Sequence, residues 1–272
     1  MYKHRLNYFA RPLLLLISIA LSACSTIEVD PTAEWTAKEF YDDARSSLES
    51  GEFQSAIKSL ETLEARFPFD PYAKQAQLDV AYAYYKFEEP ESAISAVDRF
   101  MRLHPRDPHI DYAYYLKGLV SFNRGTGFLD DWFPRDHARH DASVMQQAYN
   151  DFSTLVRLYP DSHYAGDSHQ RMIFLRNKMA QKEIEIAEFY IKRETWLSAI
   201  NRAKNVIERY QDSSWSHRAL EIMVEGYKQL GLHDLAADAG RVLSLNEPDN
   251  NIQNPLPDEK LGKPPAIARN LN

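Results

Sequence analysis

The sequence is poor in cysteine, in glycine and in long apolar runs. Its 272 residues include one cysteine, so no disulfide can form within the chain. Nine glycines are too few for an all-β protein with many tight turns, or for glycine-rich phosphate loops. The net charge of −7 disfavours nucleic acid as a partner, because phosphate binding requires a basic face. The 44% apolar and 26% charged residues form a globular balance that excludes a wholly disordered chain.

The N-terminus has the pattern of a secretory signal peptide, which we place at residues 1–23. A basic start with Lys3 and Arg5 is followed by twelve apolar, uncharged residues from Pro12 to Ala23. As a helix, these rise only about 18 Å, which is too short to span a bilayer core of about 30 Å.

The next residue, Cys24, follows the letters LSA at residues 21–23, an arrangement that resembles the bacterial lipobox. In a lipobox the cysteine becomes the new N-terminus and carries a diacylglycerol and an N-acyl chain, so we expect these lipids on Cys24 and no other cofactor. The alternative is an ordinary signal peptide with a chance cysteine. Ser25 favours the outer membrane over the inner one. Residues 24–35 lack periodicity and predict a lipidated tether.

The body of the chain repeats itself. A small residue stands twelve positions before an alanine in pairs such as Ala44 and Ala56, and a proline such as Pro68 follows twelve positions after it. The repeated alanines are Ala56, Ala93, Ala148, Ala199 and Ala236, spaced by 37, 55, 51 and 37 residues. Two insertions therefore interrupt a period of 37 residues. The fourth copy has Gln211 where the others have proline.

A tyrosine three residues after the small position, as at Tyr84, makes the pattern similar to the tetratricopeptide signature. Each unit is then a pair of helices that cross at the small residues, and the proline ends the second helix. One pair cannot bury its own apolar face, but stacked pairs can. We predict an all-α superhelix of about five helix-turn-helix repeats at residues 36–247.

Two further segments and a tail complete the organisation. The insertion at 124–141, RGTGFLDDWFPRDHARHD, is interpreted as a loop folded over the body, with a second contact surface as the alternative. Residues 164–181 keep their apolar side chains at helical spacing and predict a helical extension before the fourth repeat. Residues 248–272 contain five of the 14 prolines and predict a disordered tail.

The offsets of a tetratricopeptide repeat predict which side chains face a binding groove. In the first three repeats this set is rich in tyrosine, a residue with a large apolar face and a hydroxyl that suits peptide binding. The predicted groove tyrosines are Tyr41, Tyr82, Tyr85, Tyr112 and Tyr115. The alternative is that they pack between neighbouring repeats.

The fourth repeat carries a candidate partner interface at Arg193, Trp196 and Arg202, because arginine and tryptophan are common interface anchors. Core packing is the alternative for Trp196, and a solvated helix face is the alternative for Arg202.

The sequence contains few residues arranged as a catalytic or metal site would require. His137 and His140, flanked by Asp136 and Asp141, could hold a metal, but no further ligand stands at a persuasive spacing and arginines are interleaved. No HExxH or GxSxG motif is present. We therefore expect no catalytic residue and no metal.

Four segments together resemble the BamD family, also called ComL or YfiO, of lipoproteins from the β-barrel assembly machinery. They are RFPFDPY at 66–72, QLDVAYAYYK at 77–86, DRFMRLHP at 98–105 and RMIFLRN at 171–177. The resemblance runs from the lipobox to about residue 247, and the proline-rich tail lies outside it.

The resemblance implies a scaffold anchored by lipid at the periplasmic face of the outer membrane. Members of the family bind the periplasmic domains of BamA through their C-terminal repeats, hold BamC and BamE, and engage unfolded outer-membrane proteins with aromatic-rich signal strands. In the family, the step at Asn201 and Arg202 lies at the BamA contact. The alternative is a tetratricopeptide lipoprotein that scaffolds cell-wall synthesis.

Replacing the one cysteine tests the anchor. Cys24→Ala removes the thiol that would carry the lipid, so the variant should be unlipidated and should not float with membranes when its partners are absent. Flotation on a density gradient measures this, and a variant that still floats contradicts the anchor.

Overall fold

The chain folds into an elongated stack of helix pairs. A computed structural model describes residues 30–124 and 137–246, with residues 137–141 described by their backbone only. The pairs are α2 (Ala37–Ser50) with α3 (Phe53–Arg66), α4 (Pro71–Lys86) with α5 (Pro90–Leu103), α6 (Ile110–Arg124) with α7 (His137–Leu158), α8 (Ala165–Ile191) with α9 (Trp196–Arg209), and α10 (Ser216–Gln229) with α11 (His233–Leu245). No strand occurs in these two ranges.

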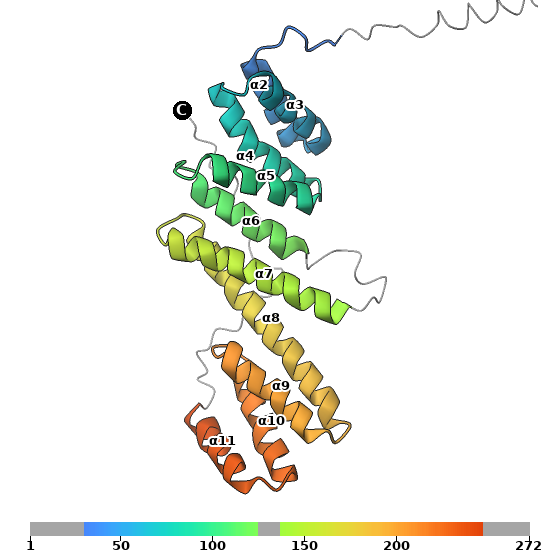
Figure 1. The fold of residues 1–272 in the computed structure, drawn as a ribbon, viewed down its shortest axis with the longest axis vertical. Helices are drawn as coiled ribbons and strands as arrows, with labels where there is room; N and C mark the ends of the chain where they lie inside the picture. The colour runs from blue at the N-terminus through green and yellow to red at the C-terminus, as the bar shows by residue number, and fades with distance from the viewer. Residues whose placement is uncertain (1–29, 125–136, 247–272) are drawn as a thin grey trace, which may run out of the picture.

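The helices follow one another along the long axis of the rod (Figure 1). Each helix packs on the next one in the chain, and the first helices of successive repeats also touch, as α2 does with α4 and α4 with α6. One continuous apolar core runs from Phe40 in the first repeat to Ile222 in the last. The predicted all-α superhelix of five repeats is confirmed.

Several predicted segments lie outside the described residues. These are the signal peptide at 1–23, the lipidated Cys24, the tail at 248–272 and residues 125–136 of the insertion. The insertion at 124–141 begins at the last residue of α6 and ends inside α7. Where the chain is described, no helix is both long enough and apolar enough to cross a membrane.

The extension expected at 164–181 is part of a single helix. α8 has 27 residues, about 40 Å long, and it runs without a break into the first helix of the fourth repeat. Its apolar residues Leu175 and Met179 are buried, as their helical spacing predicted. α8 therefore packs on α7 with its first half and on α9 with its second half.

Local chemistry sets where the helices begin and turn. The hydroxyl of Thr36 accepts a hydrogen bond from the backbone of Glu39 and the Glu39 carboxylate accepts one in return, which caps α2. The turn within a repeat uses a left-handed residue five positions before the repeated alanine. Glycine fills it at Gly51, with φ of 82°, but Glu88 and Glu194 adopt the same conformation at 61° and 57°.

The predicted crossing residues lie where the paired helices meet. Ala44, Ala56, Ala81 and Ala93 are fully buried. In the third repeat the small residue of the first helix is Gly118, and a Cβ added there would lie 2.5 Å from the ring of Phe152. Only a residue without a side chain allows α6 and α7 to approach this closely.

The end of the predicted tether is folded onto the first repeat. Trp35 packs edge-on against Phe40, with ring centroids 5.1 Å apart. Arg66 forms an ion pair with Asp30 and donates a hydrogen bond to the carbonyl oxygen of Thr32 at 2.8 Å. Hydrogen bonds from Thr32, together with Arg66, lower the pKa of Asp30 to about 2. Residues 30–35, which the sequence placed in the tether, therefore belong to the folded body.

The crossing at Gly118 can be tested by adding one methyl group. Gly118→Ala should lower the free energy of unfolding by about 1–3 kcal/mol, because Phe152 is fully buried and has no room to shift. Thermal or urea unfolding followed by circular dichroism measures the loss.

The matched control is Gly240→Ala in α11, where the added Cβ meets no atom within 4 Å. This change should stabilise the chain slightly, because alanine is the better helix former by about 1 kcal/mol. Equal effects of the two substitutions would contradict the close crossing.

Candidate binding surfaces

The five predicted groove tyrosines lie on the first helices of repeats one to three, and two of them are buried. Tyr115 is 0% exposed and Tyr112 is 3% exposed. The ring of Tyr115 stacks on that of Tyr164 at 4.8 Å, and its hydroxyl donates a hydrogen bond to Asp167 Oδ2 at 2.7 Å. The prediction that Tyr112 and Tyr115 line an accessible groove is therefore wrong.

The physical reason lies in the extension that precedes the fourth repeat. Tyr164 and Asp167 belong to the segment that interrupts the 37-residue period, and they cover the side of α6 that a regular repeat would leave open. The offset rule assumes an uninterrupted stack, so it assigns these two tyrosines to the groove.

The other three tyrosines are partly exposed, as a binding surface requires. Tyr41 donates a hydrogen bond to Asp79 Oδ2 at 3.0 Å. Tyr82 and Tyr85 have ring centroids 6.4 Å apart on α4, and the Tyr85 hydroxyl accepts a hydrogen bond from Asn123 at 2.8 Å. We call Tyr41, Tyr82 and Tyr85 the tyrosine surface.

Burial keeps the phenols of Tyr41 and Tyr85 neutral. Burial, reinforced by the negative charge of Asp79, raises the pKa of Tyr41 well above its usual range. Burial also raises the pKa of Tyr85, and this outweighs the opposing hydrogen bond from Asn123. Both side chains therefore present neutral aromatic rings to a ligand, and Tyr41 remains a hydrogen-bond donor.

A cavity of about 290 Å³ opens beside this surface, between the second and third repeats. Its lining is mostly apolar and is formed by Pro71, Lys74, Gln75, Leu78, Phe100, Asp107, Pro108 and His109. Gln75 donates a hydrogen bond to Asp79 at 3.0 Å, so the cavity wall and Tyr41 share one buried carboxylate. The volume is of the size that one large side chain of a ligand would occupy.

An ion pair lies at the polar side of this cavity. Lys74 Nζ lies 2.8 Å from Asp107 Oδ2, and the Asp107 side chain is only 4% exposed. Burial opposes ionisation of Asp107, but hydrogen bonds from Lys74 and His109 outweigh it and lower the pKa of this carboxyl. The cavity therefore combines an apolar wall with a cation held in place by a buried acid.

Sequence reasoning missed the buried charges that hold these elements. Asp79 is 5% exposed and joins α4 to α2 through Tyr41. Arg171 is 4% exposed; its Nε bonds Asp167 Oδ2 at 2.6 Å, and its guanidinium lies 5.2 Å from the centre of the Phe122 ring. Two features of the sequence could have revealed these buried charges. Asp79 stands within the apolar run of α4, and Asp167 and Arg171 stand four residues apart on α8.

Of the predicted interface residues, Arg193 lies in the turn from α8 to α9, Trp196 is the first residue of α9, and Arg202 lies further along α9. The exposed Arg193 guanidinium stacks on the ring of Phe189, 4.1 Å from its centre. Trp196 is half-buried at the start of α9, and Leu197 beside it is 61% exposed. We call this group the α8–α9 corner.

Arg202 is held by an acid of the neighbouring helix. Its Nη1 lies 3.2 Å from Glu183 Oε2, and its side chain is 42% exposed. The ion pair orients the guanidinium while leaving part of it accessible, so the residue is neither core nor an unrestrained surface side chain.

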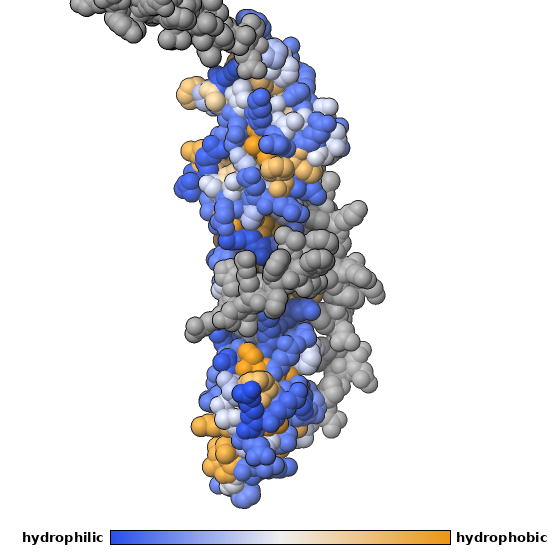
Figure 2. Space-filling view, turned by 90° about the vertical axis from the view of Figure 1, so that its right-hand side faces the viewer, coloured by the Kyte–Doolittle hydropathy of each residue, from blue (hydrophilic) through white to orange (hydrophobic). Residues whose placement is uncertain are grey.

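The last repeat leaves much of its apolar surface uncovered. α11 buries only Ala236 and Ala239, and its Leu245 is 84% exposed. The other exposed apolar residues of this end are Leu230, Leu232, Leu235 and Val242. Figure 2 shows hydrophobic patches gathered at the C-terminal end of the rod, among hydrophilic side chains. A stack of repeats whose last helix exposes apolar side chains offers a binding surface to a partner protein.

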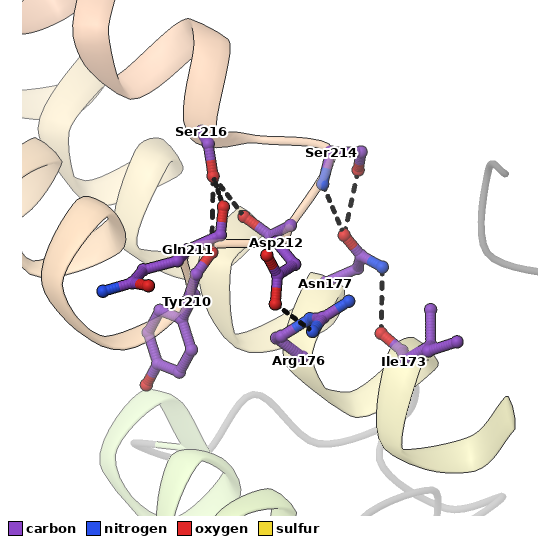
Figure 3. A network of polar contacts seen from close by, with 9 residues as sticks. Ile173, Arg176, Asn177, Tyr210, Gln211, Asp212, Ser214 and Ser216 are labelled. Carbon is purple, nitrogen blue, oxygen red and sulfur yellow. Dashed lines mark hydrogen bonds and ion pairs between the residues drawn. The ribbon is translucent and has the colours of Figure 1, made fainter. Parts of the chain in front are cut away.

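A polar network replaces the proline that the fourth repeat lacks (Figure 3). Ser216 donates a hydrogen bond to the carbonyl oxygen of Gln211 at 2.6 Å. The buried Asn177 of α8 accepts a hydrogen bond from the backbone of Ser214 at 2.7 Å and donates one to the carbonyl oxygen of Ile173. These hydrogen bonds attach the turn from α9 to α10 to the long helix α8. They thereby fix the orientation in which the last repeat leaves α8.

The structure offers no metal centre in its described part, where no three side chains of histidine, cysteine, aspartate or glutamate are grouped for one. The side chains of His137 and His140, the weak metal candidates, lie outside this part.

Comparison with known proteins identifies related sequences. The YfiO family model, described as outer membrane lipoprotein, matches residues 33–243. This chain belongs to that family.

The match extends over most of the length of curated relatives in the family. Outer membrane protein assembly factor BamD of Neisseria gonorrhoeae is 40% identical over 245 residues, which are 88% of this chain and 92% of the relative. The protein of the same name from Vibrio cholerae is 35% identical and covers 86% of this chain and 96% of its own length. The one from Haemophilus influenzae is 32% identical over 93% of this chain and 97% of the relative.

The two classes of tyrosine should differ in stability experiments. Tyr115→Ala removes a fully buried ring and the partner of Asp167, and should lower the free energy of unfolding by about 3–5 kcal/mol. Tyr82→Ala, at a half-buried position, should cost much less. Urea unfolding measures both, and similar losses would contradict the division into core and surface tyrosines.

Proposed function

We propose that this protein is a non-enzymatic scaffold of the β-barrel assembly (Bam) complex, anchored by lipid at the periplasmic face of the outer membrane. The observation that carries the proposal is the match with the BamD proteins, at 40% identity over 92% of one relative. The family model matches residues 33–243, which include nearly all of the rod of five repeats. A helical-repeat rod of this kind is typical of proteins that bind other polypeptides without altering them covalently.

The anchor in this proposal is the lipid on Cys24. Several acyl chains contribute about 0.8 kcal/mol for each buried CH₂ group, which is enough to hold a protein stably on a membrane. Asp30 is already bound to the first repeat through Arg66, and it stands only six positions after Cys24. A lipid on Cys24 therefore holds the first repeat near the membrane, and the rest of the rod extends from there.

The C-terminal repeats are the proposed binding site for the periplasmic domains of BamA. Two features support this choice: the uncovered apolar end of α11 and the α8–α9 corner with Arg193, Trp196 and Arg202. An apolar centre next to oriented arginines is the composition of a protein interface. BamC and BamE are proposed as further partners, on the resemblance alone.

Unfolded outer-membrane proteins are the proposed substrates of the N-terminal repeats. The tyrosine surface of Tyr41, Tyr82 and Tyr85 supplies aromatic faces, and the neighbouring cavity accepts one large side chain. An extended segment rich in aromatic residues fits such a surface, because rings pack on rings and the hydroxyls supply hydrogen bonds.

The alternative is a lipoprotein scaffold of cell-wall synthesis, which shares the anchor and the repeats but not the partners. Affinity purification from membranes, with identification of the bound proteins, separates the two. Recovery of BamA supports the assembly role, and recovery of peptidoglycan synthases without BamA contradicts it.

Reversal of one charge tests the BamA contact. Arg202→Glu should weaken co-purification of BamA by about a hundredfold or more, because a like charge placed in an interface costs several kcal/mol. Quantitative pull-down from solubilised membranes measures the change, with helicity checked by circular dichroism.

Two variants control for indirect effects. Glu183→Gln removes the ion pair within the chain but keeps the cation of Arg202, so BamA binding should persist. Arg102→Glu makes the same charge reversal on an exposed residue of α5, far from the α8–α9 corner, and should also leave binding intact. Undiminished binding by Arg202→Glu removes this residue from the interface.

A further inference from the structure

The turn between α3 and α4 displays an aromatic side chain completely to solvent. Phe69 is 99% exposed, more than any other large apolar residue of the described chain. It stands in the segment from Phe67 to Ala73, which reads FPFDPYA and carries one charge, that of Asp70. A solvated turn would be expected to hold polar side chains at this position.

The turn itself is rigid. The Asp70 carboxylate accepts a hydrogen bond from the backbone of Tyr72 at 2.9 Å and so caps α4. The Asp70 amide bonds the carbonyl oxygen of Phe67 at 3.0 Å, and the Phe67 ring packs 6.4 Å from Phe40 in the core. Phe69 is therefore held outward by a fixed backbone, which lowers the entropic cost of placing it against a partner.

The equivalent positions of the other repeats are charged. The residue after the proline, or after the glutamine of the fourth repeat, is Arg106, Asp161 and Asp212 in turn. All three are exposed. The aromatic residue is therefore a property of the first repeat and is not required by the turn, which the other repeats build with a charged residue in its place.

The first repeat is also where the chain leaves for its proposed anchor. Asp30 is bound by Arg66, and Phe69 follows Arg66 by only three residues. Asp30 stands six positions after Cys24, so a lipid on Cys24 holds this end of the rod within about 20 Å of the membrane surface. The same end of the rod thus carries both the exit of the tether and the exposed ring.

We propose that the α3–α4 turn is a second membrane contact, in which Phe69 enters the interfacial region of the lipid bilayer beside the anchor. The proposal rests on lipidation of Cys24, which brings the turn into reach. A lipid anchor alone leaves the rod free to pivot about its tether. A ring inserted next to the tether adds a second point of attachment and restricts the directions in which the rod extends.

The chemistry of the turn favours lipid as the occupant. Phenylalanine gains free energy when its ring leaves water for an apolar phase. The prolines on either side supply no backbone N–H that would lose a hydrogen bond on entering the interface. The one charge of the turn, on Asp70, lies at the N-terminus of α4 and is satisfied by the backbone of Tyr72.

The chain allows a direct test, because lipidation consumes its one cysteine. In the lipidated protein carrying Phe69→Cys, the introduced thiol is the only free one, and a polarity-sensitive fluorophore can be attached to it alone. The protein is reconstituted in vesicles of phosphatidylethanolamine and phosphatidylglycerol, with and without bromine on the acyl chains. Asp161→Cys, labelled in the same way at the equivalent turn of the third repeat, is the matched control.

The proposal predicts a blue-shifted emission and strong quenching by brominated lipid for the fluorophore at position 69, with neither effect at position 161. Absence of quenching at position 69 in protein that floats with the vesicles overturns the proposal and leaves the anchor standing. Equal quenching at both positions shows that the fluorophore itself seeks lipid, and also overturns it. Protein that does not float lacks the anchor, and both proposals fall.

Discussion

The close crossing of paired helices at alanine and glycine is the constraint on which the rest of the rod depends. Ala44 and Ala56 in the first repeat, and Gly118 against Phe152 in the third, let helix axes approach to a distance that a larger side chain would prevent. This approach brings the flanking apolar residues into one continuous core from end to end. In the described chain the main contacts pass between helices of the same repeat or of adjacent repeats, so each repeat is free to carry a different surface.

The different surfaces follow from that freedom. The first repeat combines the tether exit with an aromatic turn, and repeats one and two carry the tyrosine surface, with a cavity where repeats two and three meet. The last repeat ends in uncovered apolar side chains. The long helix α8 joins these regions and is fastened by Arg171 on one side and by Asn177 on the other. A rod with separate surfaces along its length suits a protein that holds several partners at once.

The candidate sites were only partly predictable from the sequence. The offsets located Tyr41, Tyr82 and Tyr85 at partly exposed positions, and composition pointed to Arg193 and Arg202, which the structure places in the α8–α9 turn and within α9. The same offsets failed at Tyr112 and Tyr115. An insertion changes which faces are covered, and a repeat pattern carries no information on how an added segment folds back. The buried charges Asp79 and Arg171 each have a partner four residues away, but their burial depends on contacts with Tyr41 and Phe122, which are distant in the sequence.

The sequence by itself determined the period of the repeats, the helix pairs and their order, because spacing of small residues, tyrosines and prolines is a local property of helices. The sequence also identified the family, because segments such as RFPFDPY at 66–72 contain residues that the repeat pattern by itself does not require. Only the tertiary structure decided which tyrosines are core and which are surface, that residues 30–35 fold onto the first repeat, and that Phe69 stands in solvent. Exposure depends on what lies across from a residue, and in a stacked rod that is set by neighbours many residues away.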